Sequence, residues 1–271
     1  MLDVDIPLMT PARQILGIRF FNGDVDEAVQ SMVQRGGFLI APSGTCFARL
    51  REDDGYRRAV LAADLAIADS GLMVLLCHLF RRQRLQRISG FKYLKHLLAR
   101  LKSARTVGVF WILPNERAAQ KLLDWSGREA LTIFGEDCHV APRYGIEVAD
   151  PNLVSLIDRD RPAHVIIGIG SGAQEKLGHY LREHLSYRPA IHCIGAALGF
   201  LTGDQIAIPD WADRIFLGWF WRLFAQPRIF IPRLVQGFEL PWLIWKYGEE
   251  MPPMRSNKSR GHVTIDRCER S

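Results

Sequence analysis

The sequence has no cysteine spacing that indicates a zinc ribbon or a disulfide framework. Its five cysteines are far apart, and none lies two or three residues from another. Zinc ribbons need such close pairs, and disulfide-rich secreted domains use an even number of cysteines. A reducing compartment such as the cytoplasm is therefore the simplest expectation.

Long apolar runs are also missing. The longest, near Leu72, is far shorter than the ~18 residues that a membrane-spanning helix requires. Residues 1–14 are acidic early and lack the basic start and apolar centre of a signal peptide. We therefore expect neither a signal peptide nor a transmembrane segment.

Several motifs of nucleotide and metal chemistry are absent. The sequence has no HExxH, no Walker A pattern and no complete GxGxxG, which counts against an ATPase and a standard dehydrogenase. His179 and His184 are five residues apart, whereas a helical metal pair is four apart. The DRD triplet at 158–160 precedes Pro162 in a helix-terminal run, which speaks against a metal–nucleotide site. We expect no metal and no cofactor.

The chain is long enough to bury one sizeable core. It has 271 residues, of which 48% are hydrophobic. Its formal net charge is +6 and its pI is about 9.2. A basic balance of this kind indicates anionic partners, namely nucleic acid, phosphorylated ligands or an acidic membrane surface.

Short continuous apolar runs alternate with segments whose apolar residues recur every three or four positions. Continuous runs indicate strands buried on both faces, and the alternation indicates a mainly parallel α/β sheet flanked by helices. The predicted strands span residues 15–20, 37–41, 65–68, 106–112, 130–134, 164–169 and 190–195. The predicted helices include residues 25–33, 56–63, 72–80, 91–101 and 118–123.

Small and polar residues follow four of the predicted strands. Ligands bind beyond the carboxyl ends of parallel strands, small residues let them approach the backbone, and helix N-termini favour phosphate. Each turn alone is more often a tight connection, but together they predict a nucleotide or nucleotide-sugar cleft. Its candidate residues are Ser43, Gly44, Thr45, Ser70, Gly71, Gly170, Ser171 and Gly195.

Asp69 stands where the apolar run 65–68 should leave the sheet, and its carboxylate has two interpretations. It either caps the helix that begins near Ser70, by accepting hydrogen bonds from backbone N–H groups, or it performs chemistry in the cleft. The two roles are compatible with each other.

Residues 214–247 combine aromatic and basic side chains. They hold four of the seven tryptophans, and five basic residues against one acid. Such a segment suits a membrane interface, where rings settle at the headgroups and cations pair with lipid phosphates. An aromatic helix packed on the core fits equally well, and burial in another subunit of a homo-oligomer is a further alternative. Nucleic acid ranks third because the run is too apolar, so we expect no nucleic-acid partner.

These observations divide the chain into three parts. Residues 1–211 form an α/β domain, and residues 212–250 form a membrane-associating appendage. Residues 251–271 lack periodicity and are expected to form a disordered tail.

Six pieces of the sequence resemble, in content, order and spacing, the motifs of the WecG/TagA/CpsF glycosyltransferase family. They are ADLAIADSG at 63–71, RISG at 87–90, IIGIGSGAQEK at 166–176, IGAALGFLTG at 194–203, IPDW at 208–211 and LGWFWRLFAQPR at 217–228. The resemblance spans roughly residues 15–235. It implies a Rossmann-like fold and an inverting, metal-independent transfer of a sugar from a UDP-sugar to a polyprenyl-diphosphate-linked saccharide. It also implies an appendage that contacts the anionic inner face of the cell membrane.

The resemblance assigns roles to individual residues. Asp69 takes the place of the general base, which removes the proton of the acceptor hydroxyl as it attacks the anomeric carbon. Gln174 and Glu175 match a Gln-Glu pair, and an amide at Gln174 suits sugar hydroxyls because it both donates and accepts. The residues matched to the acceptor diphosphate and the membrane are Arg222, Arg228, Arg233, Trp219 and Trp221.

Each assignment has a structural alternative. Gln174 would otherwise face solvent at the start of a helix, and Glu175 would only favour the helix dipole. The three arginines would form a solvated basic face. Arg87 either pairs with a phosphate or closes an internal salt bridge. Cys46 lacks a recognisable catalytic partner and His192 lies inside a strand, so we expect both to be buried packing residues.

Some positions depart from the family pattern, and they are Ala41, Ser43, Lys92, Gly199, Ala207 and Gly218. These changes predict a divergent branch with a different donor or acceptor in surface or exopolysaccharide assembly. The sugar is therefore not carried over from the resemblance. The alternative function is a non-catalytic subunit that binds a nucleotide sugar or a lipid diphosphate.

Overall fold

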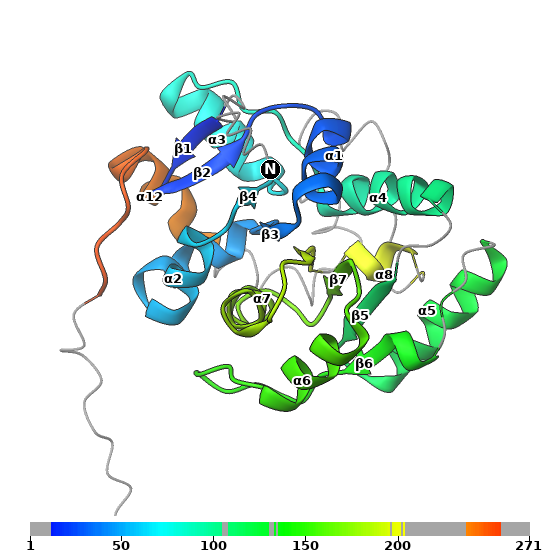
Figure 1. Cartoon of the computed structure of the whole chain (residues 1–271). Helices are drawn as coiled ribbons and strands as arrows, with labels where there is room; N and C mark the ends of the chain where they lie inside the picture. Colours follow the sequence, from blue (N-terminus) through cyan, green and yellow to red (C-terminus); the bar gives the residue numbers. More distant parts are fainter. Residues whose placement is uncertain are drawn as a thin grey trace, which may run out of the picture.

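The computed structural model describes residues 12–104, 108–129, 133, 135–195, 197–201, 203 and 237–255. These residues contain an eight-stranded sheet with the order β1-β2-β4-β3-β8-β7-β5-β6. β1 pairs with β2 antiparallel, and every other neighbouring pair is parallel. Helices cover both faces of the sheet (Figure 1). The predicted mainly parallel α/β architecture is confirmed.

The elements are short, as the lengths of the apolar runs predict. The strands are β1 (Ala12–Ile15), β2 (Ile18–Phe21), β3 (Gly37–Ile40), β4 (Leu65–Ala66), β5 (Val109–Leu113), β6 (Cys138–Val140), β7 (His164–Ile167) and β8 (Ala190–Cys193). The α-helices are α1 (Val25–Arg35), α2 (Asp54–Leu61), α3 (Gly71–Arg81), α4 (Gly90–Ala104), α5 (Glu116–Arg128), α6 (Pro151–Asp160), α7 (Ala173–His184), α8 (Ala197–Leu201) and α12 (Glu239–Tyr247). Two 3-10 segments are η1 (Gly44–Arg51) and η2 (Gly135–Asp137).

The predicted strand at 15–20 is wrong, because this stretch is the turn and second strand of a β-hairpin. Ile15 pairs with Ile18, and the turn consists of Leu16 and Gly17. Both turn residues have positive φ, 48° and 80°, as two-residue hairpin turns of type I′ require. Leu16 is fully buried, so the apolar run continues through the turn and hides it from periodicity.

The remaining predicted strands are present and shorter, with one exception. The predicted strand at 130–134 lies outside the described residues, apart from Ile133. The strand that lies beside β5 at this end of the described sheet is β6.

Two apolar clusters lie on opposite faces of the sheet. The first joins the sheet to η1, α2, α3, α6, α7 and α12, and the second joins it to α1, α4, α5 and α8. After β3 and β7 the chain therefore turns to the first face, whereas after β8, which lies between them, it turns to the second. Open α/β sheets bind ligands at such points, beyond the carboxyl ends of the strands.

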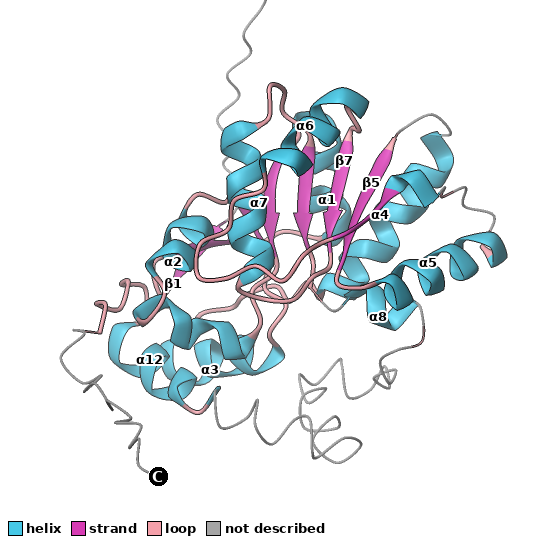
Figure 2. Cartoon of the chain, turned by 90° about the horizontal axis from the view of Figure 1, so that it is seen from below, coloured by secondary structure: helices cyan, strands magenta, loops and turns pink. Residues whose placement is uncertain are grey.

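The described end of the aromatic segment packs on the core. Leu240, Leu243 and Ile244 of α12 are buried against α3 and η1. Arg81 of α3 donates from Nε to the Ile244 carbonyl over 3.1 Å and from Nη2 to the Trp245 carbonyl over 2.5 Å. The Ile244 carbonyl also accepts from the Gly248 N–H, so Arg81 gives it a second donor and gives a donor to the Trp245 carbonyl at the end of α12. Figure 2 shows α3 and α12 together beyond the carboxyl ends of the parallel strands.

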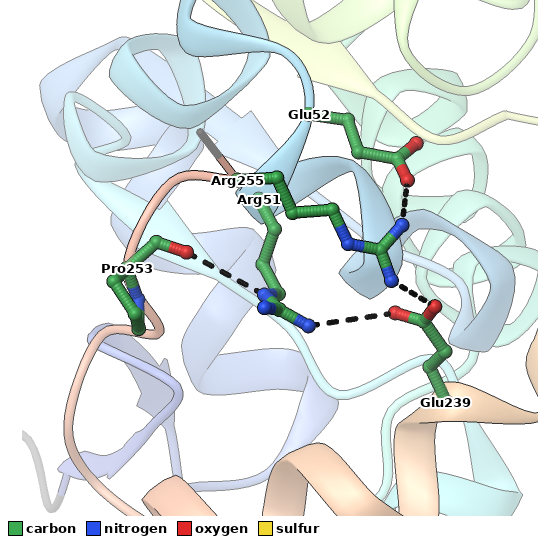
Figure 3. Close-up of polar contacts among 5 residues, drawn as sticks. All are labelled: Arg51, Glu52, Glu239, Pro253 and Arg255. Carbon is green, nitrogen blue, oxygen red and sulfur yellow. Dashed lines mark hydrogen bonds and ion pairs between the residues drawn. The ribbon is translucent and has the colours of Figure 1, made fainter. Parts of the chain in front are cut away.

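Residues 251–255 continue along η1. Arg255 bonds to both Glu52 and Glu239, and Arg51 lies 4.0 Å from Glu239 and donates to the Pro253 carbonyl over 3.5 Å (Figure 3). These contacts hold the start of the predicted tail against the domain, while residues 256–271 lie outside the described part of the chain. The three-part division of the chain remains a prediction. No helix among the described residues is long and apolar enough to span a bilayer.

Candidate functional site

The loops predicted to form the cleft meet at the carboxyl edge of the sheet. A Cβ atom added to Gly90 would lie 3.1 Å from the Ile194 carbonyl and 3.9 Å from the Ala41 Cβ. One added to Gly44 would lie 3.0 Å from the Ser70 Oγ. The turns after β3, β4 and β8 and the start of α4 are therefore in direct contact, and these three turns are among the four that the sequence predicted to form the cleft.

Asp69 is half-buried at this junction and does not cap α3. Its Oδ1 accepts a hydrogen bond from the Gly90 N–H over 2.9 Å, so it holds the start of α4. Ser70 is the N-cap of α3, because its Oγ accepts from the Met73 N–H over 3.2 Å. The alternative in which Asp69 caps α3 does not hold, because Ser70 has an extended backbone and places its hydroxyl one residue nearer the helix.

Arg87 also contacts Asp69, through the backbone. Its Nε donates to the Asp69 carbonyl over 3.1 Å, and the side chain is half-buried. Together with the Gly90 contact, this bond ties the segment between α3 and α4 to the end of β4.

Gln174 and Glu175 are fully buried in the first turn of α7, so the alternative in which Gln174 faces solvent does not hold. The Glu175 carboxylate accepts from the Gly172 N–H over 2.5 Å and from the Gln174 Nε2 over 2.9 Å. Burial raises the pKa of this carboxyl above its ordinary value, and the bonds to Gln174 and Gly172 oppose the rise. The Gln174 Oε1 has no hydrogen-bond partner within the described residues.

Glycines shape the loop that leads into α7. Gly170 and Gly172 have φ values of 103° and 95°, in the region that favours glycine. A Cβ added to Gly172 would lie 2.3 Å from the Arg49 Nη1. Gly195, also at positive φ, lies beside the Gln174 side chain. A Cβ added to Gly195 would lie 3.4 Å from the Gln174 Nε2.

Arg49 is a residue of this site that the sequence reasoning missed. It lies in the last turn of η1, and its guanidinium covers the backbone of Gly172. Its charge lowers the pKa of Glu175 against the effect of burial. The only signal available was a basic residue one or two turns after the Ser43–Gly44 turn.

The Cys46 thiol contacts both the turn after β3 and the turn after β7. It lies 3.3 Å from the Ser43 Oγ and is also hydrogen-bonded with Ser171. Burial raises its pKa, which leaves the thiol protonated and a poor nucleophile. The prediction that Cys46 is a buried packing residue is confirmed, and the Ser43 and Ser171 hydroxyls lie in contact with it.

The remaining predicted residues lie as follows. Gly71 begins α3, Thr45 lies in η1, and Lys92 is exposed in the first turn of α4. His192 is buried in the sheet, as predicted, between the Tyr93 hydroxyl and His164. The appendage residues Arg222, Arg228, Arg233, Trp219 and Trp221 lie outside the described residues.

The fold and the site together define an α/β protein with a ligand site at the carboxyl edge of a mainly parallel sheet. The sequence model of the Glycosyl transferase WecG/TagA/CpsF family matches residues 13–253, which is most of the chain and includes every loop of the site. The chain belongs to this family. It is a glycosyltransferase of cell-surface polysaccharide synthesis. Family members in general use a nucleotide-sugar donor and a lipid-linked acceptor. No match is found among curated proteins.

Proposed function

We propose that this protein transfers a hexose-type sugar from a UDP-sugar to a polyprenyl-diphosphate-linked saccharide, with inversion and without a metal ion. The observation that carries the proposal is the position of Asp69, where the turns after β3, β4 and β8 meet the start of α4. The base of an inverting transfer contacts the acceptor hydroxyl next to the bound donor. The donor is expected beyond the ends of the strands, so a base at this junction is suitably placed.

The contacts of Asp69 suit a base. The Gly90 N–H holds Oδ1 at 2.9 Å, which fixes the orientation of the carboxylate. The other oxygen, Oδ2, makes no hydrogen bond within the described part of the chain. It is the atom that we assign to receive the proton of the attacking hydroxyl.

The donor side of the site is assigned to the loop before α7. Gln174 offers an acceptor oxygen, and the Arg49 guanidinium over Gly172 supplies a positive charge for the diphosphate of a nucleotide sugar. The ligand approaches the backbone of the cleft where the side chains are small, at Ser43, Gly44, Gly170, Ser171 and Gly195. The acceptor diphosphate is assigned to Arg222, Arg228 and Arg233, on the sequence resemblance alone.

We place the protein on the cytoplasmic side, at the inner face of the cell membrane, because a polyprenyl-linked acceptor stays in the bilayer. The aromatic and basic composition of residues 214–247 supports peripheral association. A homo-oligomer that covers the same aromatic residues is the competing arrangement, and sedimentation velocity without lipid tests for it.

The decisive experiment is the substitution Asp69→Asn. Asparagine keeps an oxygen for the Gly90 N–H but cannot take up a proton, so turnover should fall at least a hundredfold while UDP affinity stays the same. Asp54→Asn on the surface of α2 is the matched control and should keep full turnover. Equal turnover of the Asp69→Asn variant and the wild type would remove Asp69 as the base.

The donor is identified by thermal unfolding with a panel of nucleotides and nucleotide sugars in the presence of EDTA. A ligand at 100 times its Kd stabilises the native state by about 2.7 kcal/mol. Stabilisation by UDP and one UDP-sugar would support the proposal. No shift with any uridine nucleotide would contradict it, and binding without turnover on any lipid-linked acceptor would favour the non-catalytic binding subunit.

A further inference from the structure

Exposed apolar side chains concentrate on α3 and beside or on α12. Eight large apolar side chains are exposed within the described residues, and five of them belong to this pair of helices and its entry. They are Leu79 (67% exposed), Phe80 (41%), Phe238 (79%), Trp242 (40%) and Trp245 (66%). Single exposed apolar residues are common in soluble proteins, but a group of them marks an interaction surface.

Arg81 joins the two helices that carry these side chains. It follows Phe80 directly in α3, and its guanidinium donates to the carbonyls of Ile244 and Trp245 in α12. The opposite faces of both helices are committed to the core, through residues such as Met73 and Leu243. We call the outward side chains of these two packed helices the α3–α12 surface.

The charge around the α3–α12 surface is positive. Residues 78–84 contain Arg81, Arg82 and Arg84 and no acid. On α12, the Lys246 ammonium lies 4.9 Å from the centre of the Trp242 ring. The acid of that helix, Glu239, is bound by Arg255. Two exposed acids, Glu249 and Glu250, follow α12, so the basic residues Arg82, Arg84 and Lys246 outnumber the acids that are not bound by an arginine.

We propose that the α3–α12 surface docks on an anionic phospholipid bilayer, with its rings and leucine among the headgroups and its arginines on the lipid phosphates. Segments that lie at a membrane interface combine aromatic and basic side chains in this way. An interface with another protein does not require such an excess of positive charge. The inference extends the proposed membrane association to α3, a helix that lies far from the appendage in the sequence.

The geometry gives α3 a second purpose. α3 begins directly after Asp69 and Ser70 and has 11 residues, so its far end lies about 16 Å from the site. Docking through Leu79 and Phe80 would hold Asp69 at that distance from the headgroups. A lipid-linked acceptor needs a catalytic residue at such a height, because its diphosphate stays at the membrane surface.

The test is co-sedimentation of the full-length protein with phosphatidylcholine vesicles, alone or with one third phosphatidylglycerol. The double variant Leu79→Ser/Phe80→Ser should bind the anionic vesicles at least tenfold more weakly. The control Leu61→Ser/Ile146→Ser removes two exposed apolar residues elsewhere (51% and 85% exposed) and should bind as the wild type does. Unchanged thermal midpoints check that all the variants fold.

The charge is tested separately. Arg84→Glu should weaken binding to the anionic vesicles about fivefold or more and leave the neutral ones unaffected, since a basic residue near such a surface contributes about 1 kcal/mol. Arg100→Glu on α4 is the matched control. Binding that is equal for Leu79→Ser/Phe80→Ser and the wild type overturns the proposal. So does a change from oligomer to monomer in that variant without any change in vesicle binding.

Failure of the proposed function is distinguishable from failure of this surface. Turnover of a short-chain, detergent-soluble acceptor requires the site but no bilayer, so the Leu79→Ser/Phe80→Ser variant should keep it. Absence of turnover in the wild type with intact vesicle binding would contradict the transferase and leave the membrane surface standing.

Discussion

The Gln174 side-chain amide donates to the Glu175 carboxylate over 2.9 Å, and this bond fixes the orientation of the amide. Because Nε2 is engaged, the buried Oε1 is the group left without a partner within the described residues. The sequence allowed Gln174 to donate or to accept. The structure leaves an acceptor, which under the proposed function accepts from a hydroxyl or N–H group of the donor.

The first prediction concerns Glu175→Gln. An amide cannot accept from both Gly172 and Gln174 as the carboxylate does, so one buried donor loses its partner. We expect the free energy of unfolding to fall by about 1–3 kcal/mol in urea denaturation. Glu183→Gln, an exposed position on the same helix, should change it by less than about 0.5 kcal/mol. Equal effects of the two substitutions would contradict the role given to Glu175.

The second prediction separates backbone strain from crowding in the loop before α7. Gly170→Ala meets no atom within 4 Å and carries only the cost of a positive φ, of order 1 kcal/mol or somewhat more. Gly172→Ala carries the same cost and also displaces the Arg49 guanidinium, 2.3 Å away. We expect Gly172→Ala to be the more destabilising in chemical denaturation and to weaken binding of UDP.

Arg49→Ala provides the check on that prediction. In its background, the difference between Gly172→Ala and Gly170→Ala should disappear, because the atom that crowds the new Cβ has been removed. If Gly172→Ala is still more destabilising than Gly170→Ala in that background, crowding by Arg49 does not cause the extra loss of stability.

The third prediction concerns the attachment of α12. Arg81→Ala removes two charged hydrogen bonds, to the Ile244 carbonyl, which keeps the Gly248 N–H, and to the Trp245 carbonyl, so the free energy of unfolding should fall by about 1.5–3 kcal/mol. Arg58→Ala breaks only a surface pair with Asp54 and should cost at most about 1 kcal/mol. Thermal and urea unfolding measure the stability of both variants. If Arg81→Ala loses no more stability than Arg58→Ala, α12 is held by its apolar face alone.

The fourth prediction is a loss of stability in acid caused by the buried histidines. The Tyr93 hydroxyl, His192 and His164 form a chain with links of 3.0 Å each. Burial lowers the pKa of His164 to about 4, and burial together with the charge of His164 lowers the pKa of His192 well below its ordinary value. Between about pH 6.5 and pH 4 the unfolded chain holds protons that the native state lacks, so stability falls as the pH falls.

The measurement is the free energy of unfolding of wild type and His164→Gln at several pH values. Burial raises the pKa of Glu175 and so acts in the opposite direction, which is why the comparison uses two proteins rather than one pH series. The wild type should lose up to about 1.4 kcal/mol per pH unit more than the variant. His184→Gln at the exposed end of α7 is the control, and parallel curves for wild type and His164→Gln would exclude the mechanism.

Several features were predictable because they depend on local chemistry. Continuous apolar runs became buried strands, Cys46 and His192 became core residues, and the small turns after β3, β4, β7 and β8 came to one edge of the sheet. The hairpin at Leu16–Gly17 was missed because a buried leucine in its turn continues the apolar pattern.

The sequence by itself determined the alternation of strands and helices, the family and the position of Asp69 at the end of a strand, since these follow from periodicity and from motifs that are local in the chain. Only the tertiary structure decided that Ser70 rather than Asp69 caps α3, that Arg49 covers Gly172, and that α12 packs on α3. The last two contacts join residues far apart in the sequence. The first depends on which of two neighbouring side chains, Asp69 or Ser70, reaches the start of the helix. Such contacts depend on backbone directions and burial, which no single stretch of sequence contains.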